Sequence, residues 1–252
     1  MHQIELRNIS LKYESVENSV TALRDISFNV EAAEFLCVVG QSGCGKTTML
    51  NIIAGFLKPT EGEILISGKP VAGKGLDRGI VFQDFAQLFP WRTAQRNVEF
   101  GLEMKGISKE ERTEIALRFL QLVNLEKFAR SYPHELSGGM QQRVAIARAL
   151  AYNPAVLLMD EPFAALDALT REEMQQFLVD VWRETNKTVI YVTHNVAEAV
   201  YLADRVIILS PHPGTVRAEV RIQLPRPRDT LSIEFLEYQK KIVGHIVGRD
   251  RF

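Results

Sequence analysis

The residues best suited to chemistry in this chain form a glycine-rich run at residues 40–48. The run is Gly40, Gln41, Ser42, Gly43, Cys44, Gly45, Lys46 and Thr47, followed by Thr48. An apolar stretch precedes it and a helical pattern follows, so we expect a loop between a strand and a helix. Glycines let main-chain N–H groups surround a phosphate chain, and the helix adds its positive end. Lys46 can then meet the β- and γ-phosphates, and the Thr47 hydroxyl can ligate Mg²⁺.

Two acids follow a second apolar run, residues 156–159. The first acid, Asp160, can hold Mg²⁺ directly or through water, and the second, Glu161, can orient and deprotonate an attacking water. An isolated pair of this kind is more often a simple loop cap. Beside a phosphate-binding loop, the catalytic interpretation is favoured.

A third motif is the run Leu136-Ser137-Gly138-Gly139-Met140-Gln141-Gln142-Arg143. Ser-Gly-Gly before a helix offers bare N–H groups and a hydroxyl, which makes a second anion site, although an ordinary helix start is the alternative. The run resembles the signature of ABC ATPases, with Met140 where that family more often has glutamine. One chain would thus carry two phosphate-binding sites.

Further residues match the ABC family in the family's order. Tyr13 resembles the aromatic residue that stacks on adenine, and Gln83 resembles the glutamine that reaches Mg²⁺ and the attacking water. Asp167 resembles the residue of a loop that crosses the dimer interface, although Ala164 stands where many members have serine. His194 resembles the histidine that contacts the γ-phosphate. The alternatives are an ordinary strand tyrosine, a surface glutamine and a structural histidine.

The resemblance covers about residues 3–223 and implies an α/β fold. This fold has a P-loop NTPase (RecA-like) core, an antiparallel β subdomain and an inserted helical subdomain at about 84–153 that carries the signature. Residues 1–223 would form the ABC ATPase domain, and residues 224–252 a short C-terminal tail with an amphipathic helix.

The resemblance also implies the ligands and their contacts, with ATP and Mg²⁺ as cofactors. The implied catalytic residues are Glu161, His194, Gln83 and Lys46, and the implied metal ligands are Thr47, Gln83 and Asp160. ATP would bind between two subunits, which are two copies of this chain or this chain and a close paralogue. Each phosphate loop would face Ser137, Gly138 and Gly139 of the other subunit.

Apolar patterns predict the elements that position these motifs. Four all-apolar runs, residues 35–39, 80–82, 156–159 and 189–192, are typical of parallel strands buried on both faces, and 206–209 is a candidate fifth. Alternating residues within 9–13 and 26–30 predict half-exposed strands, and a stripe from Leu50 to Leu57 predicts a helix. Helical patterns at 108–124 and 139–151 lie between adjacent buried strands, which indicates a helical insert.

Residues 84–106 are predicted to be a loop that is rich in apolar side chains, namely Phe85, Leu88, Phe89, Pro90 and Trp91. Apolar residues are costly to expose, so they indicate a binding groove, unless the loop packs on its own core. In ABC importers this region receives a short helix of the membrane subunit. We therefore expect transmembrane permease subunits to dock near Phe85–Trp91.

The Pro90-Trp91 pair and the run Leu224-Pro225-Arg226-Pro227-Arg228 are similar to importer subunits for small anions such as nitrate, taurine and alkanesulfonates. We therefore expect a subunit that powers such an importer, with a solute-binding protein as an indirect partner. The competing class is a soluble ABC ATPase of DNA repair or translation. Those proteins usually carry coiled-coil inserts or tandem copies, which this chain lacks.

Composition limits the remaining options. The chain has 252 residues, of which 46% are hydrophobic, and a formal net charge of −1, so it suits one large α/β domain and does not favour nucleic acid. Cys37 and Cys44 form neither a disulfide framework nor a zinc site. No apolar run approaches the ~18–20 residues that span a bilayer. We expect a location at the cytoplasmic face of the inner membrane, reached through membrane subunits. We expect the remaining histidines, His2, His134, His212 and His245, to be surface or packing residues.

Overall fold

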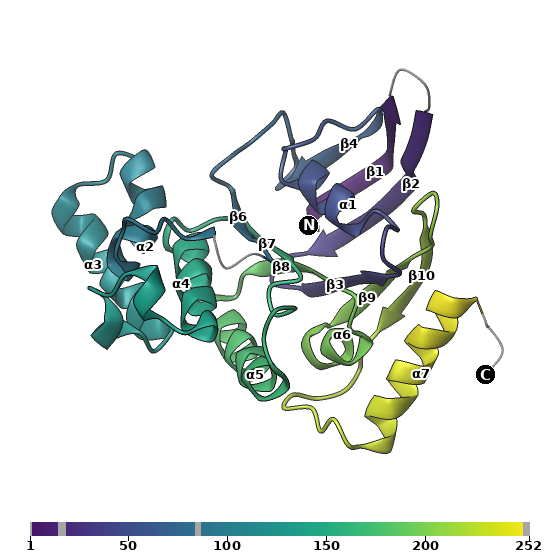
Figure 1. Cartoon of the computed structure of the whole chain (residues 1–252). Helices are drawn as coiled ribbons and strands as arrows, with labels where there is room; N and C mark the ends of the chain where they lie inside the picture. The colour runs from purple at the N-terminus through teal and green to yellow at the C-terminus, as the bar shows by residue number, and fades with distance from the viewer. Residues whose placement is uncertain (1, 15–18, 84–86, 249–252) are drawn as a thin grey trace. The chain divides into compact units, whose positions relative to one another are not determined.

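The structure is a computed structural model that describes residues 2–14, 19–83 and 87–248 (Figure 1). It divides into two compact units. The first comprises Met1–Gly75 with Thr188–Phe252, and the second comprises Leu76–Lys187. The predicted boundary between residues 223 and 224 and the predicted subdomain at about 84–153 stay predictions.

The first unit begins with an antiparallel sheet in the order β2-β1-β4-β5. Its strands are β1 (His2–Glu14), β2 (Ser19–Glu31), β4 (Glu61–Ile66) and β5 (Lys69–Pro70). Ile9 and Leu11 of β1 are buried, as the sequence pattern predicts, and Ser10 between them is buried too. Tyr13, the next residue in that alternation, is exposed.

A second sheet of the first unit contains the strands that carry the predicted site. Strand β3 (Phe35–Gly40) lies between β8 (Thr188–Thr193) and β9 (Arg205–Leu209) and runs parallel to both. Strand β10 (Val216–Arg221) pairs with β9 in the antiparallel direction. Every residue of β3, β8 and β9 is buried, which confirms the prediction from continuous apolarity. Because the three strands are parallel, their carboxyl ends meet at one edge.

Three helices belong to this unit: α1 (Lys46–Ile53), α6 (Val196–Leu202) and α7 (Ile233–Val247). Helix α1 ends before the predicted Leu57 because Gly55 turns left-handed, with φ 76°. A Cβ at Gly55 would lie 2.1 Å from the Gly73 carbonyl oxygen, so only glycine fits there. Helix α7 lies in the predicted tail and packs against α6, β9 and β10, and its Phe235 and Ile242 side chains are buried.

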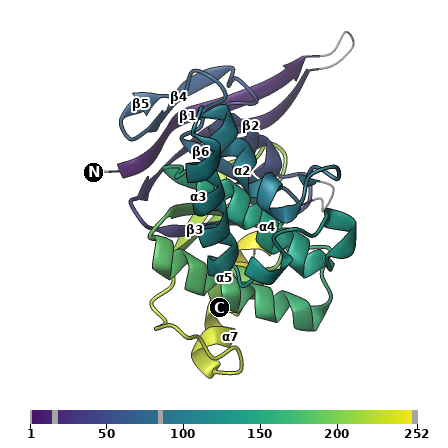
Figure 2. The ribbon, with the colours of Figure 1, turned by 90° about the vertical axis from the view of Figure 1, so that its left-hand side faces the viewer.

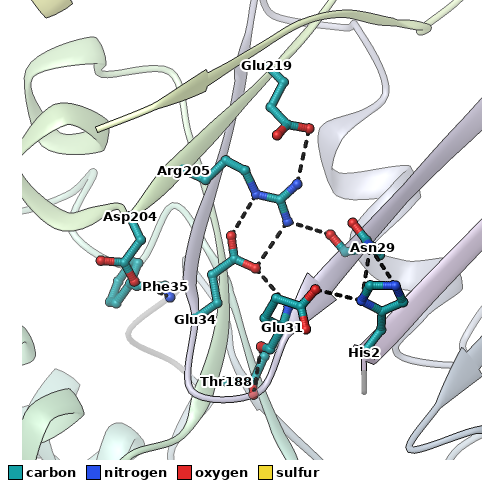
Figure 3. A network of polar contacts seen from close by, with 9 residues as sticks. All are labelled: His2, Asn29, Glu31, Glu34, Phe35, Thr188, Asp204, Arg205 and Glu219. Carbon is teal, nitrogen blue, oxygen red and sulfur yellow. Dashed lines mark hydrogen bonds and ion pairs between the residues drawn. The ribbon is translucent and has the colours of Figure 1, made fainter. Parts of the chain in front are cut away.

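An ionic network joins the two sheets of the first unit (Figure 3). Arg205, the first residue of β9, contacts Glu34 Oε1 at 2.6 Å and Glu219 Oε2 at 3.0 Å. It also donates to the main-chain oxygen of Asn29 in β2. Arg205 is buried, so these acceptors offset the cost of removing its charge from water. The network fixes the turn between β2 and β3, and therefore the start of the strand that leads to the phosphate loop.

The second unit combines two parallel strands with a group of helices. Strands β6 (Arg78–Val81) and β7 (Val156–Asp160) pair directly. The helices are α2 (Ala94–Met104), α3 (Lys109–Leu122), α4 (Gly138–Ala151) and α5 (Ala168–Thr185), with short 3₁₀ turns η2 (Glu126–Phe128) and η3 (Pro133–Glu135). Helices α2, α3 and α4 lie side by side (Figures 1 and 2). Two of them, α3 and α4, are the predicted helices between adjacent strands.

The prediction of a loop over residues 84–106 is wrong for its second half, which forms α2. Thr93 caps this helix by accepting a hydrogen bond from the Arg96 N–H at 3.3 Å. Residues 94, 98 and 102 are buried at helical spacing. The apolar cluster directly before the helix masks this pattern in the sequence, because it breaks the helical spacing of the apolar residues.

Candidate functional site

The glycine-rich loop has the backbone that its sequence predicts. Gly43 and Gly45 have φ values of 79° and 93°, a left-handed conformation that favours glycine. A Cβ at Gly45 would lie 2.5 Å from Leu23 Cδ2, and a Cβ at Gly40 would lie 2.6 Å from Cys44 Sγ. The three glycines therefore allow a turn too tight for other residues, and α1 begins directly after it.

Lys46 turns back into this loop. Its ammonium group donates to the carbonyl oxygens of Gly40 at 2.9 Å and Gln41 at 3.2 Å, and only 6% of the residue is exposed. Burial raises the pKa of the neighbouring Cys44 thiol, so this side chain stays a small neutral group. Thr47 is exposed, as are Gln41 and Ser42 at the start of the loop, whereas Thr48 is half-buried.

These features fit a polyphosphate ligand. A loop held open by glycines, a helix N-terminus and a buried ammonium group converge on the same turn. The exposed Thr47 hydroxyl is an oxygen donor of the kind that Mg²⁺ prefers. Among the residues that the structure describes, no group of three or more His, Cys, Asp or Glu side chains is placed to hold a metal ion.

His194 lies at the same edge of the sheet as the phosphate loop. Thr193 ends β8 opposite Val39 of β3, so the exposed His194 follows beside the loop's first glycine. The Thr193 hydroxyl donates to the buried Glu198 carboxylate at 2.5 Å. Asn195 caps α6 by accepting a hydrogen bond from the Glu198 N–H at 3.2 Å. The backbone is thus fixed on both sides of His194.

The Pro- and Arg-rich run of the tail holds the other end of α6. Arg228 donates to the main-chain oxygens of Val200 at 2.6 Å and Ala203 at 2.7 Å. Arg226 binds Asp204 Oδ1 at 2.6 Å, and the other oxygen of that carboxylate accepts from the Phe35 N–H at the start of β3. Desolvation lowers the pKa of Arg228 to about 10. The sequence singled out this run only through its similarity to importer subunits. Its role in holding α6 was not predictable, because the residues that it contacts are more than twenty positions away along the chain.

The acid pair and Gln83 lie in the second unit. Val81 of β6 pairs with Met159 of β7, so Gln83 and the acids leave the sheet at the same edge. Asp160 and Glu161 are half-buried, whereas Gln83 is exposed. Glu161 has φ 43°, a left-handed conformation that is uncommon for a residue other than glycine. Such backbone outliers cluster at functional sites.

The signature motif forms the start of α4. Ser137 is exposed and caps the helix by accepting from the Met140 N–H at 3.3 Å. Gly139 is buried, and a Cβ there would lie 3.2 Å from Thr170 Cγ2. Gln141 donates to the carbonyl oxygens of Pro133 and Leu136, which fixes the turn before the helix. Gly138 and Gly139 then present the first N–H groups of α4.

Gln87 ties the signature helix to the end of β6, and sequence reasoning missed it. Its carboxamide pairs with both the N–H and the carbonyl of Phe82, at 3.1 and 3.0 Å. It also donates to the buried Gln142 side chain at 3.1 Å, while Arg148 donates to its carbonyl oxygen at 2.7 Å. A polar residue within an apolar run was the only sequence signal for this role.

Asp167 and the predicted docking segment have local structural partners. Asp167 caps α5, and its hydrogen bonds from Thr170 lower the pKa of the carboxyl group.

Leu88 is buried, as the packing alternative requires, whereas Trp91 is 70% exposed. Phe85 lies outside the described residues. Across the described ranges, no helix has the length and apolarity needed to cross a membrane.

Comparison with known proteins agrees with these observations. Residues 23–164 match the family model described as ABC transporter. An uncharacterized ABC transporter ATP-binding protein of Methanocaldococcus jannaschii is 56% identical and covers 96% of this chain and 90% of its own length. A nitrate import ATP-binding protein of Synechocystis is 46% identical, and the match covers 99% of this chain and 97% of the relative. A taurine import ATP-binding protein of Roseobacter denitrificans is 48% identical, and the match covers 88% of this chain and 83% of the relative.

Solved structures point the same way. A dimeric ATP-binding cassette in a post-hydrolysis state with ADP and Pi has a TM-score of 0.75 and 40% identity, and the match covers 88% of this chain and 100% of that one. A second dimeric structure, of a bacterial ABC transporter cassette, has a TM-score of 0.76 and 41% identity. That match covers 88% of this chain and 100% of the cassette. With its α/β P-loop NTPase fold, the chain belongs to the ABC transporter family as an ATP-binding, ATP-hydrolysing subunit.

Proposed function

We propose that this chain powers an ABC importer for a small anionic solute at the cytoplasmic face of the inner membrane. The observation that carries the proposal is the full-length match to a nitrate import ATP-binding protein, which covers 99% of this chain. The taurine import relative supports the same class of solute. Neither relative favours a soluble DNA-repair or translation factor. Nitrate, taurine and alkanesulfonates are the candidate solutes, and a solute-binding protein would deliver them to the membrane subunits.

The proposed chemistry is transfer of the γ-phosphoryl group of ATP to water. Lys46 would neutralise charge on the β- and γ-phosphates, and Tyr13, which is exposed on β1, would stack on adenine. Thr47, Gln83 and Asp160 would hold Mg²⁺, which supplies further positive charge at the phosphates when it is bound. Phosphoryl transfer depends chiefly on positioning and charge stabilisation, so these residues need not form covalent bonds.

The remaining roles concern the attacking water and the γ-phosphate. Glu161 would orient the water and accept its proton, because Asp160 would be committed to the metal. His194 would contact the γ-phosphate from the edge next to β3. The hydrogen bonds around Thr193 and Asn195 support this role, since they hold the histidine's backbone in place. For the second unit, the shared edge of β6 and β7 supports a common task for Gln83 and the acids.

We also propose that two subunits share each ATP, which would bind between one chain's phosphate loop and the partner's Ser137, Gly138 and Gly139. The partner would be a second copy or a close paralogue, and the dimeric cassettes of similar structure support this assembly. Asp167 would lie in the loop that crosses the interface. Residues 1–223 would form the ATPase domain, including the helical subdomain at about 84–153, and residues 224–252 the tail.

A mixing experiment tests the shared site. Lys46→Ala chains lack a working phosphate loop, and Ser137→Arg chains lack a working signature. A mixed dimer would contain one intact composite site, so we expect ATP-dependent dimerisation and hydrolysis to reappear only in the mixture. The single variants and a mixture of identical variants are the controls. If the mixture dimerises with ATP no better than either variant alone, the shared-site proposal is wrong.

The solute requires a separate experiment. The chain would be purified with its membrane subunits in mild detergent and reconstituted in vesicles. ATP-dependent uptake of labelled nitrate, taurine and an alkanesulfonate would then be compared with the Glu161→Gln complex as the inactive control. Uptake of none of these anions by a complex that hydrolyses ATP would contradict the small-anion proposal.

A further inference from the structure

The phosphate loop lies between two loops that each carry a histidine. Strand β3 is flanked by β8 and β9, and all three run in the same direction (Figure 1). The loops after their carboxyl ends therefore share one edge, where open α/β sheets bind their ligands. His194 follows β8 on one side. On the other side, Gly40 pairs with Leu209, and the connection to β10 that begins there contains His212.

The connection between β9 and β10 is hydrogen-bonded to β2 and lies against the phosphate loop at Cys44. The Gly214 N–H donates to the Ala22 carbonyl at 3.0 Å, and the Gly214 carbonyl accepts from the Arg24 N–H at 2.9 Å. A Cβ at Gly214 would lie 2.2 Å from the Cys44 carbonyl oxygen. Glycine at this position thus permits a main-chain approach that another residue would block.

The base of the same connection is closed by its own side chains. The hydroxyls of Ser210 and Thr215 are 2.7 Å apart, and the Thr215 N–H donates to Ser210 Oγ at 3.1 Å. Pro211 and Pro213 on either side of His212 each have a restricted φ angle. The histidine is therefore presented from a stiff, anchored loop.

The His212 ring lies against the glycine-rich turn itself. A Cβ at Gly43 would lie 3.5 Å from His212 Cε1 and 3.7 Å from His212 Nε2. His212 is exposed, so its ring is not required to fill a core. Its φ of 36° is left-handed, which is uncommon for a residue other than glycine and recurs at ligand-binding sites.

We propose that His212 is a nucleotide-binding residue whose imidazole N–H donates a hydrogen bond to a phosphate oxygen beyond the α-phosphate. An imidazole has such a donor on one nitrogen when neutral and on both when protonated. The proposal rests on the assignment of residues 40–48 as the nucleotide site. His194, in the loop after β8, and His212, in the loop after β9, would then contact the phosphate chain from opposite sides of β3.

Equilibrium binding of ADP and AMP, measured by calorimetry without turnover, tests the proposal. His212→Ala weakens ADP binding on the order of tenfold, the loss typical of one hydrogen bond to a charged group. AMP binding stays unchanged, because AMP lacks the phosphates that His212 contacts. His212→Gln keeps an N–H donor and retains most of the ADP affinity. His245→Ala, in the tail helix, is the matched control and binds both nucleotides as wild type does.

The outcomes separate this proposal from its alternatives. Equal loss of ADP and AMP affinity in His212→Ala would show that the ring only supports the loop, and unchanged ADP affinity would show that it contributes nothing. Either result overturns the proposal. Lys46→Ala shows where a failure lies. If Lys46→Ala weakens ADP binding and His212→Ala does not, only the role of His212 fails. If Lys46→Ala binds ADP normally, the nucleotide site itself is wrongly assigned.

Discussion

The Lys46 ammonium donates a 2.9 Å hydrogen bond to the carbonyl oxygen of Gly40, the residue that ends β3. A buried ammonium is thus held by neutral acceptors. Hydrogen bonds between two charged groups are stronger than those to a neutral carbonyl, so a phosphate would be the better acceptor. The loop therefore keeps the lysine close to the place where a phosphate would bind.

Replacement of Lys46 tests this arrangement. Lys46→Ala is expected to abolish ATP hydrolysis and weaken nucleotide binding, because the phosphates lose their positive partner. Lys46→Met keeps the bulk of the buried side chain, so it separates loss of charge from loss of packing. Calorimetric nucleotide binding and phosphate release would be measured for both, with the exposed Lys58→Ala as control. Wild-type turnover in Lys46→Met would rule out the assigned role.

The acid pair gives a second prediction. Glu161→Gln keeps the size and hydrogen bonding of the side chain but removes the general base. ATP binding should survive while hydrolysis falls by roughly 10²–10⁴, the contribution typical of such a base. The variant should then accumulate as an ATP-bound dimer, visible as a size shift in chromatography with ATP and Mg²⁺. Glu172→Gln, at an exposed position of α5, is the control.

Two results would contradict the role of Glu161. One is hydrolysis near the wild-type rate in Glu161→Gln. The other is the absence of an ATP-dependent dimer under conditions where the wild-type chain binds ATP. His194→Ala should also lose hydrolysis, and its loss would support the γ-phosphate contact only if nucleotide binding is largely retained.

Much of the fold could be predicted because its signals are local. Residues 35–39, 156–159 and 189–192 are continuously apolar, and burial on both faces of a sheet is what allows that pattern. Helix α3 begins within the predicted pattern at 108–124, and Ser108 caps it by accepting a hydrogen bond from the Glu111 N–H at 3.3 Å. In contrast, α2 follows an apolar cluster, so its own periodicity was hidden.

The functional contacts divide in the same way. The phosphate loop depends on the backbone of consecutive glycines, which their order in the sequence reveals. The contacts of Gln87 with Gln142 and of Arg228 with Val200 join residues far apart along the chain. No local pattern encodes them, since they arise only when the strands and helices are assembled. For the same reason, the sequence predicts His212 only as a surface or packing residue.

The tail arginine gives a prediction on stability. Arg228→Met leaves the carbonyl oxygens at the end of α6 without their buried donors, and an unsatisfied buried polar group costs about 1–3 kcal/mol. We expect the free energy of unfolding in urea to fall by about that amount. Arg221→Met, at an exposed position of β10, should unfold as wild type does. Identical urea midpoints and slopes for Arg228→Met and wild type would show that the tail does not stabilise α6.

Trp91, shortly before α2, differs from the aromatic and aliphatic residues near it that pack inward. Phe89 packs edge-on against Phe100, with ring centroids 4.7 Å apart, and Leu88 is buried. The Trp91 ring lies beside that of Phe89, with centroids 5.6 Å apart, yet 70% of Trp91 is exposed. A large exposed aromatic residue held by its neighbours is typical of an interface anchor.

Replacement of Trp91 therefore tests docking of the membrane subunits. Trp91→Ala should sharply reduce solute uptake by the reconstituted complex, because the permease loses an aromatic anchor, while ATP hydrolysis by the isolated chain stays near wild type. Phe128→Ala removes another exposed aromatic side chain of the same unit, 41% exposed, and should affect neither activity. Co-purification of the permease with each variant would measure docking directly. Equal loss of uptake and isolated ATPase activity in Trp91→Ala would instead show that Trp91 supports the fold of its own chain.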